Sequence, residues 1–125
     1  MVNLVETNMI REFKGLVVDI KREEGSDKFP PQYVLQIKAL EKPEWGLMKA
    51  WITIPKTATN TDVPKKSLLG VYMNRLQNWG IVADTHQETI HKMLDKTFLW
   101  KDEAPKIDGE IITKKEKLVP QTLLK

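Results

Sequence analysis

The stretch LMKAWITIP, residues 47–55, carries the clearest strand pattern in this sequence. Its polar and apolar side chains alternate, and a period of two places the two sets on opposite faces of a β-strand. We expect Lys49, Trp51 and Thr53 to face outward. Pro55 ends the pattern, because proline has no N–H group to donate to a sheet. The opposite set, which is expected to face the core, comprises Met48, Ala50, Ile52 and Ile54.

Two strands with a similar pattern precede this one, at residues 13–22 and 32–40. A turn-rich loop, residues 23–31, separates them. The first strand alternates between two sets, which are Leu16, Val18 and Ile20 against Val17, Asp19 and Lys21. The second alternates between Tyr33, Leu35, Ile37 and Ala39 on one face and Val34, Gln36 and Lys38 on the other. Three consecutive strands therefore come before the first helix signal.

The strongest helix signal follows a polar linker and contains an apolar stripe at helical spacing. The stripe consists of Leu69, Tyr72, Met73, Leu76 and Trp79. Pro64 or Ser67 is a suitable start, and Gly80 stands where a glycine commonly follows a helix. A second, shorter helix is expected after Thr85, because Glu88 three residues later completes a capping box.

The last part of the chain predicts two more strands around a hairpin. A fourth strand is expected at residues 97–101, and its pattern does not decide whether Phe98 and Trp100 or Leu99 face the core. Asp108-Gly109 is a strong hairpin turn signal. We therefore expect a fifth strand from Glu110 to about Val119, ending at Pro120.

This order, three strands, a helical insert and two strands, predicts an all-β fold with the helices between strands three and four. It is the order of the OB-fold, a five-stranded Greek-key barrel whose helix plugs one end. No alternation of strands and helices is present, which argues against a doubly wound parallel sheet. An SH3-like small barrel and an α+β sheet remain alternatives. We expect one domain over residues 12–120, with a lead-in at 1–11 and a tail at 121–125.

Composition and charge narrow the function classes. The chain has 125 residues, 41% of them apolar and 30% charged, which is typical of a folded domain. It has no cysteine, so disulfides, thiol nucleophiles and cysteine zinc sites are excluded. The net charge of +3 permits an anionic partner. The start lacks the pattern of a signal peptide, and no apolar run is long enough to span a bilayer, so we expect a cytoplasmic protein.

Nothing in the sequence predicts catalysis, and we expect neither a metal nor a cofactor. Common nucleotide-binding, hydrolase and metalloprotease motifs are absent. His86 and His91 are five residues apart and do not share a helix face, so we expect both to be solvated. The paired carboxylates, such as Glu23-Glu24, lie in segments expected to be wet, where their pKa values would not be raised for acid catalysis.

The outward residues of the middle strands form the most specific candidate site. Trp51 lies between Lys49 and Thr53, and Lys38 would line the same surface from the second strand. Aromatic rings and lysines in this arrangement hold single-stranded nucleic acids, because bases stack on the ring and cations follow the phosphates. Trp45 lies in the preceding loop. Lys114 and Lys115, on the last hairpin arm, would border the same groove.

A second hypothesis uses the same residues differently. Trp45, Trp51 and Met48 would suit a protein–protein interaction or structural module, because aromatic residues and methionine are enriched at such interfaces. The salt dependence of binding separates the two hypotheses, since only phosphate contacts make binding strongly salt-dependent.

The order of features from Phe13 to Pro120 resembles a group of small phage-encoded single-stranded-DNA-binding proteins with OB-folds. The segments that carry the resemblance are FKGLVVD at 13–19, YVLQI at 33–37, Gly46, LQNWG at 76–80, MLDK at 93–96, Asp108-Gly109 and Val119-Pro120. The group commonly has glycine where Asp95 stands. The resemblance implies a non-catalytic protein that binds single-stranded DNA in replication or recombination. RNA as a partner is not excluded, and the oligomeric state stays open.

Overall fold

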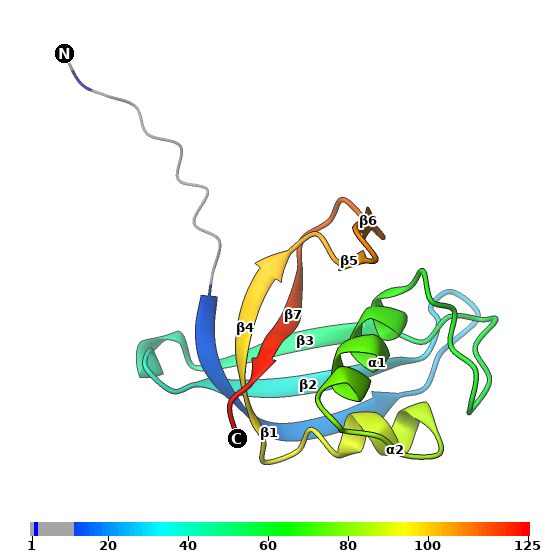
Figure 1. The fold of residues 1–125 in the computed structure, drawn as a ribbon, viewed down its shortest axis with the longest axis horizontal. Helices are drawn as coiled ribbons and strands as arrows, with labels where there is room; N and C mark the ends of the chain where they lie inside the picture. The colour runs from blue at the N-terminus through cyan, green and yellow to red at the C-terminus, as the bar shows by residue number, and fades with distance from the viewer. Residues whose placement is uncertain (1, 3–11) are drawn as a thin grey trace.

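The computed structural model describes residue 2 and residues 12–125, and its main element is a five-stranded antiparallel sheet in the order β3-β2-β1-β4-β7 (Figure 1). Strands β5 and β6 form a separate two-stranded hairpin. The strands are β1 Glu12–Glu23, β2 Gln32–Ala39, β3 Leu47–Thr53, β4 Thr97–Glu103, β5 Lys106–Ile107, β6 Glu110–Ile111 and β7 Lys117–Leu123. The helices are the 3-10 turn η1 Pro43–Trp45, α1 Leu68–Asn78 and α2 His86–His91. An all-β fold with a helical insert is confirmed.

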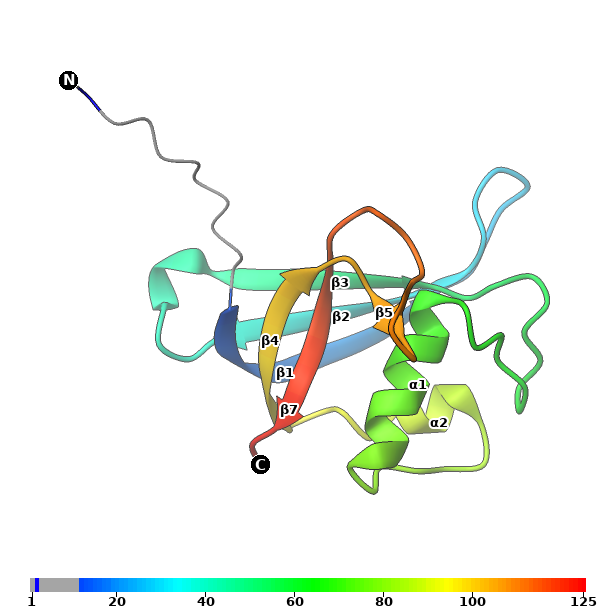
Figure 2. The same ribbon diagram turned by 45° about the horizontal axis from the view of Figure 1, so that its top comes forward.

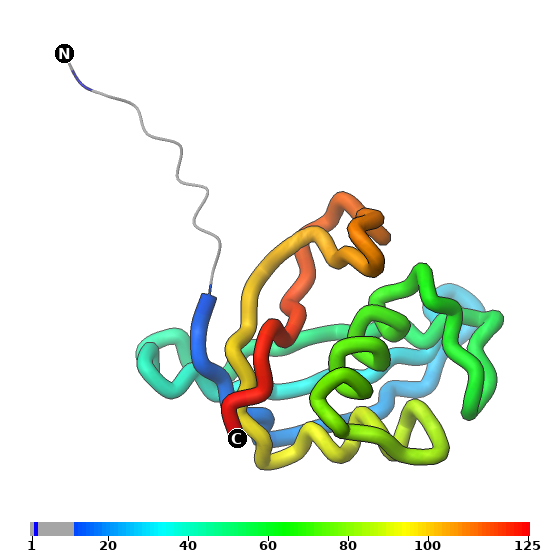
Figure 3. The backbone as a smooth tube through the Cα atoms, viewed as in Figure 1, coloured from blue at the N-terminus to red at the C-terminus, as the bar shows by residue number. Residues whose placement is uncertain are grey.

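The long strand β1 bends the sheet, because its two halves pair with different neighbours. Its first half pairs with β4, and most of its length pairs with β2. A bulge between Val17 and Asp19 makes Val18 an extra residue, so Val17 and Ile20 both pack on the core side. The strict alternation predicted for this strand is therefore wrong beyond Val17. Figures 2 and 3 show β4 and β7 crossing steeply over the flatter β1–β2–β3 layer.

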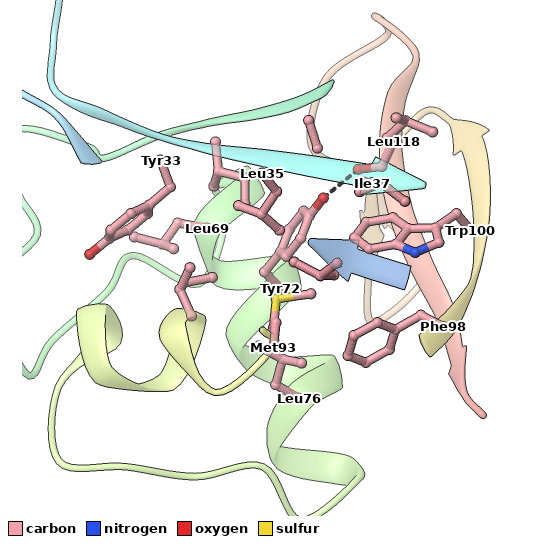
Figure 4. Packing of buried hydrophobic residues seen from close by; sticks show 14 of the residues in the cluster. Tyr33, Leu35, Ile37, Leu69, Tyr72, Leu76, Met93, Phe98, Trp100 and Leu118 are labelled. Atoms are coloured by element: carbon pink, nitrogen blue, oxygen red, sulfur yellow. Dashed lines mark hydrogen bonds between the residues drawn. The ribbon is translucent and has the colours of Figure 1, made fainter. Parts of the chain in front are cut away.

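The helical insert closes the space between these two layers. Ser67 caps α1, because its Oγ accepts a hydrogen bond from the Gly70 N–H, and Gly80 follows the helix at φ +80°. Thr85 caps α2 as expected, because its Oγ1 accepts a hydrogen bond from the Glu88 N–H. The Glu88 carboxylate accepts from the Thr85 hydroxyl, instead of from the Thr85 N–H as in a full capping box. The inward residues of α1 are buried as predicted, namely Leu69, Tyr72, Met73 and Leu76. Figure 4 shows three of them, Leu69, Tyr72 and Leu76, packed with the sheet.

The choice left open for β4 is decided by burial. Phe98 and Trp100 are fully buried, and the Trp100 Nε1–H donates to the Gly15 carbonyl at 3.1 Å. Trp79, predicted for the core, is partly buried and packs against Phe98 with ring centroids 5.7 Å apart.

The prediction for the last strand is wrong. The Asp108-Gly109 turn is present, but β6 has only two residues, and the fifth strand of the sheet is β7, which contains Pro120. Proline is tolerated there because β7 is an edge strand, and the β4–β7 register also shifts between Leu99 and Trp100. The expected domain boundary at 120 therefore falls inside β7. The expected lead-in, apart from residue 2, lies outside the described residues.

Helix α1 covers the free edge of β7. The Tyr72 hydroxyl donates to the Leu118 carbonyl at 2.6 Å, and Arg75 Nη1 donates to the Pro120 carbonyl at 2.8 Å. Pairing between β3 and β7, which would close a barrel, is absent from the strand pairs within residues 12–125. Over the same range, no helix is long and apolar enough to cross a membrane.

Candidate nucleic-acid interface

The candidate interface lies on the side of β2 and β3 that faces away from the core. Cross-strand pairing builds it from four rows, which are Lys38–Leu47, Gln36–Lys49, Val34–Trp51 and Gln32–Thr53. We call these eight residues the outer face. Lys38, Lys49, Trp51 and Thr53 are all exposed, so their predicted outward direction is confirmed. The core side of β3 is buried, because its residues pack under α1 and within the main cluster.

Trp51 lies near the middle of the outer face, where its indole is half exposed. Its side chain is 52% exposed. Its cross-strand neighbour Val34 is only 7% exposed although it points outward, and Lys21 of β1 flanks Val34 on the other side. Larger side chains therefore lie over Val34. An aromatic ring supported in this way offers a free surface for stacking.

The lysines of this region form no ion pair, as is also true of several lysines elsewhere in the described range, such as Lys56 and Lys106. Lys21, Lys38 and Lys49 are exposed and form no ion pair with any residue of the described range. By contrast, Lys14 pairs with Glu41 at 3.1 Å. Three unpaired cations around one exposed indole make this region attractive to an anionic polymer.

Sequence reasoning missed Lys21 as a member of this surface. The bulge at Val18 changes which side chains of β1 face outward, so the period of two cannot be followed through it. Acidic residues are also present on this strand. Asp19 stands in the same row as Gln36, and Glu23 accepts a hydrogen bond from the Gln32 side chain at 2.6 Å. Lys21 therefore lies between two acidic residues along β1, whereas Lys38 and Lys49 belong to β2 and β3.

Trp45 is not brought onto the outer face. It closes the turn η1 and packs edge-on against Phe13, with ring centroids 5.7 Å apart, while remaining 39% exposed. Phe13 is a core residue of β1. The two exposed tryptophans therefore have separate surroundings, and only Trp51 belongs to the surface that carries Lys38 and Lys49.

The other candidate lysines lie in a different part of the fold. Lys114 and Lys115 are exposed in the loop between β6 and β7, which Figure 1 shows beyond the ends of β4 and β7. Two further lysines, Lys65 and Lys66, precede α1. Their ammonium groups pair with Asp108 and Glu110 of the β5–β6 hairpin. Lys114 and Lys115 are thus separate from the four rows, and the neighbouring basic pair is neutralised.

The prediction that His86 is solvated is wrong, because this histidine is 6% exposed. Its Nδ1 lies 2.6 Å from the Tyr33 hydroxyl of β2. Burial, together with the charge of Arg22, lowers the pKa of His86 below its ordinary value of 6.5. No local signal reveals a partner 53 positions away in the chain. His91 is exposed, as predicted.

A hollow of about 420 Å³ lies beside α1, between the loops that flank it. Polar side chains such as Asn74, Gln77 and Asp84 line it, but it shares no residue with the outer face. Within the described range no group of three histidine or acidic side chains is placed to hold a metal ion.

Comparisons with protein-family models, with curated proteins and with solved structures find no match for this chain. The outer face is therefore interpreted from its own chemistry.

Proposed function

We propose that this chain is a non-catalytic protein that binds single-stranded nucleic acid, with DNA as the main partner, on the outer face of β2 and β3. The observation that carries the proposal is the exposed Trp51 among three unpaired lysines. The ring would stack on bases, and Lys21, Lys38 and Lys49 would contact phosphates. A role in replication or recombination belongs to the same proposal and rests on the resemblance described above.

The fold part of the proposal is an OB-type barrel left open between its third and last strands. The strand order β3-β2-β1-β4-β7 is what such a barrel gives when one seam is unpaired, and α1 lies in the expected place between strands three and four. Oligonucleotides bind OB-folds on the face of strands two and three. Asp95 adds support, because it adopts φ +64°, a conformation that favours the glycine common in the resembling group.

The experiment is a titration of a dye-labelled poly-pyrimidine DNA strand, followed by fluorescence anisotropy. If a base stacks on the indole, Trp51→Ala weakens binding by ~1–3 kcal/mol, which is about 5- to 150-fold. Trp45→Ala is the matched control, because it removes another partly exposed indole from outside the outer face. Equal losses in the two variants would show that Trp51 has no special place in binding.

The salt dependence of the same titration counts the lysines involved. Three phosphate contacts on a single strand give a log–log slope of about −2, and hence roughly a 20-fold loss of affinity between about 50 and 200 mM salt. Participation of Lys114 and Lys115 would raise this loss to roughly 100-fold. No binding of DNA or RNA by the wild type at ~50 mM salt would refute the proposal, since phosphate contacts are strongest at low salt.

The alternative of a protein–protein interaction module is favoured by one observation. Leu47 is 54% exposed on the same face as Trp51, so the surface is partly apolar as well as basic. A protein partner docking on these side chains would show little salt dependence, because apolar contacts release few counterions.

A further inference from the structure

The two edges of the sheet are treated differently by the fold. The edge of β7 is covered, since Tyr72 and Arg75 of α1 bond to its carbonyl groups, and Pro120 has no N–H to offer. Strand β3 forms the other edge and pairs only with β2 among the described strands. It has seven residues, without a proline or a recorded bulge. Of the protective features that natural edge strands commonly carry, β3 has one charged side chain, Lys49, but neither a proline nor a bulge.

The register shows which backbone groups of β3 are free. The Ile54 N–H donates to the Pro31 carbonyl at 2.9 Å, so the even-numbered residues of this segment bond to β2. The N–H and C=O groups of the odd-numbered residues therefore point away from the sheet, and none of them bonds to another described residue. These free groups belong to Leu47, Lys49, Trp51 and Thr53, whose side chains are all exposed.

We propose that this edge is a self-association surface, on which β3 of a second copy pairs antiparallel with β3 of the first. In the symmetric register centred on Ala50, every free N–H and C=O group of the odd-numbered residues finds a partner. Lys49 then lies opposite Trp51 of the other copy, and Leu47 lies opposite Thr53. Each contact occurs twice, because the arrangement has two-fold symmetry.

Charge complementarity favours a second copy as the occupant. Lys49 is the only charged residue of β3, and the register centred on Ala50 places it against an indole instead of against its own copy. A lysine over a tryptophan ring is a cation–π contact, and directly opposite side chains in antiparallel strands interact. A register centred on Lys49 would bring two ammonium groups together, which is destabilising. The register centred on Ala50 is therefore favoured, because it pairs all four odd-numbered residues of β3 and keeps the two ammonium groups apart.

Such pairing would join the outer faces of two copies into one surface. Four lysines and two indoles would lie near the seam, drawn from Lys38, Lys49 and Trp51 of each copy. This consequence for a bound strand rests on the proposed function. The pairing itself does not, so it is tested without nucleic acid, and its failure would leave the Trp51 titration unaffected.

Sedimentation and amide hydrogen exchange of the wild-type chain, each over a range of concentrations, test the proposal together. We expect the mass to rise from 14.5 kDa toward twice that value. Amides of the odd-numbered residues of β3 should slow as the mass rises, by about ten-fold when nine-tenths of the chains are paired, because only unpaired chains exchange there. Amides of Met48, Ala50 and Ile52 should stay slow at every concentration, since they bond to β2.

A proline variant tests the edge directly. Lys49→Pro removes an N–H that points away from β2, so the sheet keeps its own hydrogen bonds while strand addition is blocked. Lys49→Gln is the matched control, because it removes the charge and keeps the N–H. We expect the proline variant to stay at 14.5 kDa and the glutamine variant to associate more weakly than the wild type, because it keeps the N–H but loses the contact between the ammonium group and Trp51.

Several results would overturn the proposal. A chain that stays monomeric, with fast odd-numbered amides at all concentrations, has no partner on this edge. A dimer whose odd-numbered amides remain fast uses another surface. Slow odd-numbered amides in a monomer would mean that the edge is covered by the same chain. If Lys49→Pro does not fold, the wild-type measurements alone decide between these results.

Discussion

Gly15 is tightly enclosed where β1 passes between β2 and β4, and Gly15→Ala tests this packing. A methyl group at this position would lie 2.4 Å from Ile37 Cγ2, 2.7 Å from Trp100 Cδ1 and 2.9 Å from Phe13 Cε2. All three side chains are at most 5% exposed, so none can move into solvent. We therefore expect the substitution to destabilise the fold.

The magnitude follows from two opposed effects. Without a clash, replacing glycine by alanine stabilises a protein by about 0.4–1 kcal/mol, because the unfolded chain loses freedom. Overpacking a core costs about 1–3 kcal/mol. Shifting the Trp100 ring would also weaken its hydrogen bond to the Gly15 carbonyl, which is worth about 1 kcal/mol. The net expectation is a loss of about 2 kcal/mol, equivalent to a fall in Tm of roughly 6–10 °C for a chain of this size.

Urea unfolding, followed by tryptophan fluorescence and far-UV circular dichroism, measures this loss. Gly109→Ala is the control, since a methyl group there meets nothing within 4 Å, and only its φ of +82° opposes the change. Combining Gly15→Ala with Ile37→Ala should cost less than the sum of the single changes, by about 0.5–3 kcal/mol. An unchanged or raised stability in Gly15→Ala would refute the packing of β1 between Ile37 and Trp100.

Three further predictions concern α1, His86 and Asp95. Leu76→Ala should lower the free energy of unfolding by ~2–5 kcal/mol in urea titrations, because Leu76 is fully buried; a loss below ~0.5 kcal/mol would place it on the surface. Because the pKa of His86 is lowered in the fold, the unfolded chain binds more protons as pH falls below 6.5. The contribution of His86 to the free energy of unfolding is therefore complete above pH 6.5 and falls as the pH drops toward the folded pKa, by at most ~1.4 kcal/mol per pH unit. In unfolding experiments at several pH values, His86→Gln should remove this slope. Asp95→Gly should leave Tm unchanged or raise it, whereas Asp95→Ala should lower it, because φ is +64° there.

The sequence alone determined the local structure of most of the chain. Strict alternation placed Lys49, Trp51 and Thr53 on the outside of β3, because neighbouring side chains of a strand always point to opposite faces. The stripe on α1 and the capping residues Ser67 and Thr85 are equally local, since each depends on groups within one or two helical turns. Such features depend only on residues close together in the chain, so a short stretch of sequence is enough to predict them.

Only the tertiary structure decided the features that depend on distant partners. Pro120 lies inside β7 because that strand is an edge whose carbonyl groups meet α1, and His86 is buried because Tyr33 lies opposite it. A bulge in β1 places Lys21 beside the outer face, and Trp45 packs against Phe13 instead of lying on that face. The free edge of β3 likewise depends on the strand order, which places β3 at the end of the sheet. Burial and pairing between residues far apart in the chain are properties of the assembled fold, so no local pattern encodes them.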